Sequence, residues 1–240
     1  MQRMETFIDG HHILYDAAAI TKITPGWFDS SYWRERGALS GQTAGRGATY
    51  FFREGGIEYA LRHYRRGGLI ARLLHDVYPR RVLRKTRAWR EWDLLARLWS
   101  EGLPVPRPVA ARVTCKGFFY RADIITAKLP APLKLSEALQ ARALAPEEWR
   151  AAGRLIRRFH EAGVCHADLN AHNIVFAADR LYLLDFDRGC LPGHKRLWPE
   201  RNLRRLLRSL RKLALQHKGF HFSAADWEIF LEAYHSVKEF

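Results

Sequence analysis

The stretch that decides the fold is His166-Ala167-Asp168-Leu169-Asn170-Ala171-His172-Asn173. It follows a helix predicted over 146–162, which Pro146 opens and Gly163 closes, and it precedes an apolar strand predicted at 174–176. A second strand, predicted at 181–184, ends at Asp185-Phe186-Asp187. The loop therefore presents Asp168 and Asn173, and the next hairpin returns a second carboxylate beside them.

This arrangement of side chains suits phosphoryl transfer. One carboxylate accepts the proton of the attacking hydroxyl, while an asparagine and a second aspartate hold Mg²⁺ on the phosphates. Beyond this, such a protein mainly positions the reactants and neutralises charge. We therefore predict Asp168 as the catalytic residue, Asn173 and Asp185 as the metal ligands, and Mg²⁺ as a cofactor.

The same residues resemble the catalytic machinery of protein kinases. His166-x-Asp168-Leu169-x-x-x-Asn173 is similar to the H-R-D-L-x-x-x-N catalytic loop, and Asp185-Phe186-Asp187 is similar to D-F-G. Average residue usage gives a chance match of the four fixed positions in on the order of one in a thousand chains of this size. The resemblance implies a two-lobed protein-kinase-like fold with a β-rich N-lobe and a mainly helical C-lobe.

The order of predicted elements agrees with that fold. Two runs at 48–52 and 59–64 flank Gly55-Gly56, which is a hairpin pattern. The other elements of the first half are helices over 69–77 and 87–100 and strands over 109–113 and 118–126. After a connector around Pro130 and Pro132, helices are predicted over 136–143 with Ser136 as N-cap, 146–162, 197–216 and 224–237. Strands first and helices afterwards indicate an α+β fold, with lobes over 1–130 and 131–240.

Upstream segments resemble the nucleotide-binding parts of kinases in altered form. Gly45 and Gly47 belong to a stretch that resembles the loop over the phosphates of ATP, although it is not a clean G-x-G-x-x-G and also fits a tight hairpin. Tyr59-Ala60-Leu61-Arg62 aligns with V-A-I-K, which places Arg62 where kinases carry lysine. Glu91 resembles the helix glutamate that pairs with this cation. The alternatives are an exposed strand arginine and a solvated helix charge.

Departures from protein kinases point to a small acceptor. No A-P-E segment follows Asp185, and only about 50 residues remain for the helices of the second lobe. Asp187 stands where D-F-G has glycine, and aspartate adopts positive φ less freely. An activation loop is therefore not expected. Asp187 and Arg188 remain candidates for contacts with metal, phosphate or substrate.

Three strings together resemble the family of 3-deoxy-D-manno-octulosonic acid (Kdo) kinases, over about residues 41–210. They are Leu61-Arg62-His63-Tyr64-Arg65-Arg66-Gly67-Gly68, 166–173 and 185–188. The resemblance implies ATP-dependent transfer to the 4-hydroxyl of Kdo on a lipid A precursor, in lipopolysaccharide inner-core assembly. It also implies peripheral residence on the cytoplasmic face of the bacterial inner membrane. A lipopolysaccharide heptose kinase and an aminoglycoside-type phosphotransferase remain alternatives, as does a pseudokinase scaffold because Arg62 replaces lysine.

The charge balance points to anionic partners. The chain has 40 Lys and Arg against 25 Asp and Glu, a net charge of +15. A predicted face near the end carries Arg201, Arg204, Arg205, Arg208 and Arg211 opposite five leucines. We expect the leucines to pack in the core, and the arginines either to be solvated or to contact substrate or anionic lipid. The apolar stripe predicted over 69–77 fits a membrane interface as well.

Several other classes of protein are not indicated. Three widely spaced cysteines give neither a zinc site nor a disulfide framework, and a reducing compartment is the default. No run of 18 apolar residues predicts a membrane span. No nucleic-acid motif accompanies the basic charge, so nucleic acid is not an expected partner.

Overall fold

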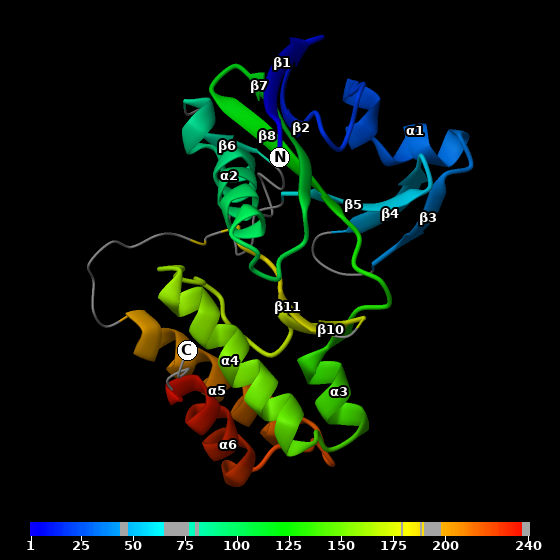
Figure 1. Cartoon of the computed structure of the whole chain (residues 1–240). Coiled ribbons are helices and arrows are strands. Elements are labelled where there is room, and N and C mark those ends of the chain that lie inside the picture. The colour runs from blue at the N-terminus through cyan, green and yellow to red at the C-terminus, as the bar shows by residue number, and fades with distance from the viewer. Residues whose placement is uncertain are drawn as a thin grey trace. The chain divides into compact units, whose positions relative to one another are not determined.

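The structure is a computed structural model that describes residues 1–43, 48–64, 77–79, 82–178, 180–187, 189 and 198–236. The chain divides into two compact units. Unit 1 comprises Met1–Glu101 and Pro106–Lys128, and unit 2 comprises Gly102–Val105 and Leu129–Phe240. Unit 1 is built on a large sheet and unit 2 mainly on helices (Figure 1), which confirms the predicted α+β class.

The sheet of unit 1 is antiparallel, with the order β1-β2-β7-β8-β5-β4-β3 and with β6 paired to β8. Its strands are β1 (Arg3–Ile8), β2 (His11–Asp16), β3 (Leu39–Gln42), β4 (Thr49–Glu54), β5 (Ile57–His63), β6 (Tyr78–Pro79), β7 (Pro108–Lys116) and β8 (Phe119–Ala127). The predicted hairpin is β4–β5, in which Gly55 and Gly56 both have positive φ, at 57° and 78°. Two consecutive positive φ values define the turn that best matches the strand twist, which is why this position carries two glycines.

The two faces of this sheet are covered differently. Trp27 of η1 (Pro25–Phe28) and Trp33 of α1 (Ser30–Glu35) pack on one face, where the Trp33 ring stacks on Phe52 with centroids 4.1 Å apart. Because successive side chains of a strand alternate, Leu61 belongs to this core and Arg62 points to the opposite face. That face is covered by α2 (Arg87–Ser100), whose bounds match the prediction; the short helix η3 (Leu83–Lys85) precedes it.

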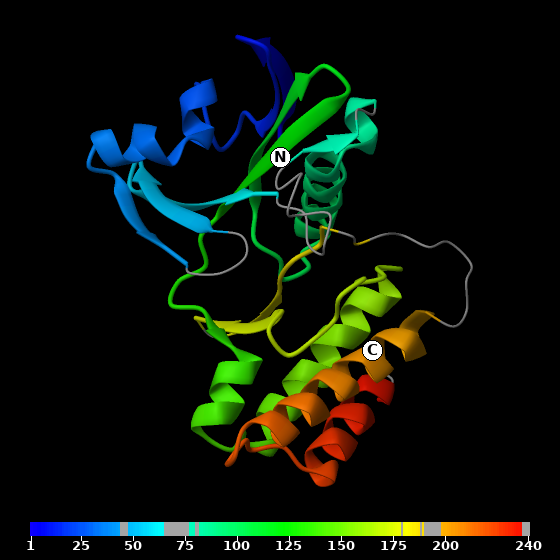
Figure 2. The same cartoon turned by 180° about the vertical axis from the view of Figure 1, so that it is seen from behind.

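Unit 2 contains four helices and a small sheet in its described part. The helices are α3 (Leu135–Ala141), α4 (Pro146–Glu161), α5 (Trp198–Gln216) and α6 (Ala224–His235), and the antiparallel strands β9 (Leu133–Lys134), β10 (Ile174–Ala177) and β11 (Arg180–Leu183) pair in the order β11-β10-β9. The helices α4, α5 and α6 lie side by side in both views (Figure 1 and Figure 2). Gly153 allows α4 and α6 to pack closely, since a Cβ at this position would lie 2.3 Å from the Phe230 carbonyl oxygen.

One local prediction, the N-cap of α3, is wrong. Ser136 is not the N-cap of α3, because Lys134 occupies that position and its backbone N–H donates to the Glu137 carboxylate at 3.1 Å. Ser136 is instead buried in the first turn, with its hydroxyl 2.8 Å from Nδ1 of His172. The helix predicted over 69–77 falls, but for its last residue, outside the described residues.

Candidate functional site

The loop after α4 brings Asp168 and Asn173 together, as predicted. Gly163, with φ of 73°, turns the chain out of the helix. Side-chain amides of Asn170 and Asn173 then donate to the Asp168 carbonyl oxygen at 3.0 and 2.9 Å, while Leu169 is buried beneath. The loop thus closes around the Asp168 backbone and leaves its carboxylate 63% exposed.

His166 braces this loop from inside. Its Nε2 lies 2.8 Å from the Leu184 carbonyl oxygen, so this nitrogen carries the proton. Its Nδ1 then accepts the backbone N–H of Asp168 at 3.3 Å. Burial lowers the pKa of His166, which keeps the ring neutral and both hydrogen bonds intact.

Asn202 of α5 holds the same loop, a contact that no pattern in the sequence predicted. Its amide makes two hydrogen bonds with the His166 backbone, accepting the N–H at 3.1 Å and donating to the carbonyl oxygen at 3.0 Å. Ser209, two turns along α5, accepts the backbone N–H of Ala171 at 3.3 Å. The available signal was an asparagine beside Leu203 on the buried side of an otherwise leucine-lined helix face.

Asp185 follows β11 and is placed next to Asn173 by the backbone. The N–H of Leu184 donates to the Asn173 carbonyl oxygen at 2.8 Å. Asp185 has φ of 64°, a left-handed conformation that is uncommon outside glycine and concentrates at functional sites. Phe186 anchors this turn, because it is buried and its ring centroid lies 4.9 Å from that of His166.

Asn173 and Asp185 have the donor chemistry that Mg²⁺ prefers. Asp185 offers an exposed carboxylate, and Asn173 offers its amide oxygen because its amide nitrogen donates to Asp168. Within the described part of the chain, no cluster of three or more His, Cys, Asp or Glu side chains could hold a metal. The pair therefore fits a cation whose other ligands are phosphate oxygens and waters, which is the usual Mg²⁺ arrangement at nucleotides.

Unit 1 contains the predicted ion pair between Arg62 and Glu91. Nη2 of Arg62 on β5 lies 2.5 Å from Oε1 of Glu91 on α2, and the Tyr64 hydroxyl donates to Oε2 at 2.5 Å. Glu91 is only 3% exposed, which excludes the alternative of a solvated helix charge. Burial, followed by the charge of Glu91, raises the pKa of Tyr64 well above its ordinary value, so this hydroxyl remains a donor.

The structure describes some of the remaining predicted residues but not all of them. Gly45, Gly47 and Arg188 lie outside the described residues. The arginine face of α5 is exposed at each of its five members, Arg201, Arg204, Arg205, Arg208 and Arg211. Of the five leucines expected in the core, Leu203, Leu206, Leu210 and Leu213 are buried, and Leu207 is partly buried.

Arg205 is the member of this face that reaches the loop. Its Nη1 lies 3.5 Å from Oδ1 of Asp168. Helical periodicity places Arg205 on the basic face, but no pattern in the sequence connects it with Asp168.

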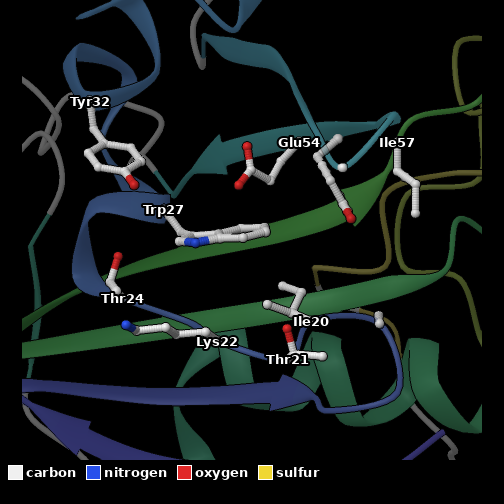
Figure 3. Close-up of a pocket in the computed structure, with 11 residues that line it drawn as sticks. Ile20, Thr21, Lys22, Thr24, Trp27, Tyr32, Glu54 and Ile57 are labelled. Carbon is white, nitrogen blue, oxygen red and sulfur yellow. The ribbon is translucent and has the colours of Figure 1, made fainter. Parts of the chain in front are cut away.

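A separate pocket of about 510 Å³ opens in unit 1 (Figure 3). Ile20, Trp27 and Tyr59 line it together with Lys22 and Glu54. Of the predicted site residues that the structure describes, none lines this pocket. Tyr59 and Arg62 project from opposite faces of β5, so the pocket and the Arg62–Glu91 pair lie on different sides of the sheet.

Comparisons with known proteins match most of the chain. The family model described as "Lipopolysaccharide kinase (Kdo/WaaP) family" matches residues 30–234. A 3-deoxy-D-manno-octulosonic acid kinase from Photobacterium profundum is 39% identical over 231 residues, covering 96% of this chain and 97% of the relative. A kinase of the same name from Actinobacillus succinogenes is 42% identical over 216 residues, covering 87% and 89%.

A solved structure supports the fold. The structure titled "WaaP in complex with acyl carrier protein" matches with a TM-score of 0.55 at 21% identity, covering 83% of this chain and 79% of that one. At this identity the likeness concerns the fold alone. Together with the family match, it confirms the predicted kinase-like fold. Among the described helices, none has the length and apolar character needed to cross a membrane.

Proposed function

Because the chain belongs to the lipopolysaccharide kinase (Kdo/WaaP) family and is therefore a kinase, we propose that it transfers phosphate from ATP to the 4-hydroxyl of Kdo on a lipid A precursor. The names and coverage of the relatives support Kdo as the acceptor. The observation that carries the chemistry is the exposed Asp168 carboxylate on a loop held by Asn173, His166 and Asn202.

Asp168 acts as the general base in this proposal. Its carboxylate accepts the proton of the sugar hydroxyl as the hydroxyl oxygen bonds to the γ-phosphorus, and the bond from that phosphorus to ADP breaks. The hydrogen bonds from Asn170 and Asn173 to the Asp168 carbonyl keep the backbone in place while the side chain meets the substrate. Positioning of this kind supplies most of the catalysis in phosphoryl transfer.

Asn173 and Asp185 are the proposed ligands of Mg²⁺, which when bound neutralises charge on the phosphates. Arg62 is the proposed contact of this chain with ATP phosphate oxygens. Its ion pair with buried Glu91 fixes the guanidinium, and 29% of the Arg62 side chain remains exposed. Gly45 and Gly47 are proposed to cover the phosphates.

The basic charge supports a place for the enzyme at an anionic membrane surface, which we propose to be the cytoplasmic face of the inner membrane. Arg201, Arg204, Arg208 and Arg211 are exposed, and within the described residues none of them has a carboxylate in ion-pairing range. Each such cation near an anionic surface contributes about 1 kcal/mol of attraction. Flotation with anionic vesicles but not with neutral ones, reversed by salt, is the expected result. Equal flotation with both would contradict this proposal.

The test of function is a transfer assay with labelled ATP, Mg²⁺ and a Kdo-bearing lipid A precursor. Mass spectrometry and fragmentation of the lipid should show one added phosphate at the 4-position of Kdo. Omission of Mg²⁺ should abolish transfer. Phosphate on a heptose-bearing acceptor, with none on Kdo, would show that the enzyme is a kinase whose acceptor is heptose and not Kdo. Phosphate at another Kdo hydroxyl would correct the position alone.

A further inference from the structure

The ion pair between Arg205 and Asp168 is unusual for the place where it occurs. It joins the proposed general base to a cation, yet both side chains are about half exposed or more, at 51% and 63%. The nitrogen–oxygen distance is 3.5 Å, whereas charge-assisted bonds from arginine to carboxylate are about 2.7–2.9 Å. The contact is therefore loose, and within the described residues Asp168 is the one carboxylate in ion-pairing range of Arg205.

The position of Arg205 over the loop is nevertheless well determined. Asn202 binds the His166 backbone one turn before it, and Ser209 binds Ala171 one turn after it. Residues 202, 205 and 209 follow the spacing i, i+3, i+7, so their side chains leave α5 on the same side. The helix thus holds a guanidinium beside the Asp168 carboxylate by contacts on either side of it along the helix.

Stability does not explain this pair. Exposed ion pairs add little to folding free energy, and a loose one adds less. Arginine has five N–H donors in a planar fork that matches a carboxylate with two parallel hydrogen bonds. At 3.5 Å from one oxygen, Arg205 uses little of that capacity, and a better-placed anion would take its fork in preference.

We propose that Arg205 binds the carboxylate of the acceptor sugar acid, beside the hydroxyl that Asp168 deprotonates. This rests on the proposed function, since the relatives are named for an octulosonic acid, a sugar that carries a carboxylate. When the acceptor binds, the guanidinium exchanges its loose contact with Asp168 for a bidentate contact with the substrate. The Asp168 carboxylate is then left to accept the hydroxyl proton. Arg205 is thereby a specificity residue that distinguishes an acidic sugar from a neutral one.

Acceptor binding with and without the sugar carboxylate tests this proposal. The two probes are a Kdo-bearing lipid A precursor and the same molecule with the Kdo carboxyl converted to its methyl ester, titrated in detergent with a non-hydrolysable ATP analogue. Esterification should weaken binding to the wild type by about 10–100-fold, the range expected for losing charged hydrogen bonds. Arg205→Gln should weaken binding of the acid by a similar factor and bind the ester no worse than the acid. Arg205→Lys should fall between, because it keeps the charge but not the fork.

Arg154→Gln is the matched control. Arg154 forms an exposed ion pair with Glu147 in the same unit, at 2.5 Å and with exposures of 43% and 67%. Its removal takes away the same charge from another exposed ion pair of the same unit, and it should leave the preference for acid over ester unchanged. Circular dichroism of each variant verifies that the fold is intact.

Three results would overturn the proposal. In the first, acceptor binding by Arg205→Gln is as sensitive to esterification as binding by the wild type. In the second, Arg205→Gln weakens only the binding of the ATP analogue, which would make Arg205 a contact of the nucleotide phosphates. In the third, Arg205→Gln no longer weakens binding of an acceptor whose lipid A phosphates have been removed, which would assign Arg205 to those phosphates. A transfer assay separates the two proposals. If the wild type transfers phosphate but binds acid and ester equally well, the proposed function stands and the role of Arg205 does not. If the wild type prefers the acid but transfers no phosphate, the role of Arg205 in binding stands and the proposed function does not.

Discussion

Removing the buried carboxylate of Glu91 should destabilise unit 1 by about 3 kcal/mol. Glu91 is 3% exposed and accepts hydrogen bonds from Arg62 and Tyr64, each at 2.5 Å. A hydrogen bond to a charged group contributes about 1.5–3 kcal/mol, and losing one partner of a buried pair costs about 3–5 kcal/mol. The low end of that range applies because Arg62, at 29% exposure, regains water when Glu91 is gone.

Two substitutions separate charge from hydrogen bonding at this position. Glu91→Ala removes both acceptor oxygens, whereas Glu91→Gln keeps the size and one acceptor and should cost about 1–2 kcal/mol. The control is Glu101→Ala, because Glu101 forms an exposed pair with Arg97 at the end of the same helix, at 2.7 Å. That change should cost less than about 0.5 kcal/mol.

Urea unfolding followed by circular dichroism measures these differences, and hydrogen exchange of the α2 amides assigns them to unit 1. If Arg62 contacts ATP, Glu91→Gln should also raise the KM for ATP about tenfold, equivalent to about 1.4 kcal/mol of lost binding. A Glu91→Ala protein as stable as Glu101→Ala would refute the reasoning that Arg62 and Tyr64 depend on the buried Glu91 carboxylate.

Three further predictions concern unit 2. Gly153→Ala should cost about 1–3 kcal/mol despite a better helix former, because the new Cβ would lie 2.3 Å from the Phe230 carbonyl oxygen; a variant with an unchanged urea midpoint would contradict this. Burial lowers the pKa of His160 from 6.5 to about 4, so the unfolded chain binds the proton first and stability falls as pH drops from 6.5 towards 4, by at most about 1.4 kcal/mol per pH unit. His160→Phe should flatten that slope in urea titrations at pH 7, 6 and 5, and equal slopes would count against the argument. Asn202→Ala should lower kcat at least about tenfold and stability by about 2 kcal/mol, since it leaves the His166 backbone without two hydrogen bonds; wild-type kinetics would show that α5 does not hold the loop.

Elements with strong local signals were predictable from the sequence. The bounds of α2 match because tryptophans and leucines recur at helical spacing and Gly102 ends the pattern. The β4–β5 hairpin follows from Gly55-Gly56, since few other residues tolerate two positive φ values. By contrast, β1 (Arg3–Ile8) lies at an edge of the sheet with mostly exposed side chains, so burial imposes little alternation on its sequence.

The candidate site divides in the same way. Asp168, Asn173 and Asp185 belong to short motifs, and the resemblance of Glu91 to the kinase helix glutamate linked it to Arg62 across 29 residues. Contacts of α5 with the loop were missed because they join residues 36 to 38 positions apart without any local pattern. Helical periodicity identified which face of α5 is buried, but not that Asn202 on that face would bind backbone.

The most direct test of the central claim is single-turnover phosphate transfer by Asp168→Asn with the Kdo-bearing acceptor. Asparagine preserves the shape of the side chain and cannot accept the hydroxyl proton, and general bases contribute about 10²–10⁴-fold to rate. We expect a loss of about 1,000-fold in the transfer rate with ATP affinity unchanged, while Glu147→Gln, which alters an equally exposed carboxylate of the same unit, leaves both unchanged. An Asp168→Asn enzyme that retains transfer within about tenfold of the wild type would contradict the role of Asp168 as general base.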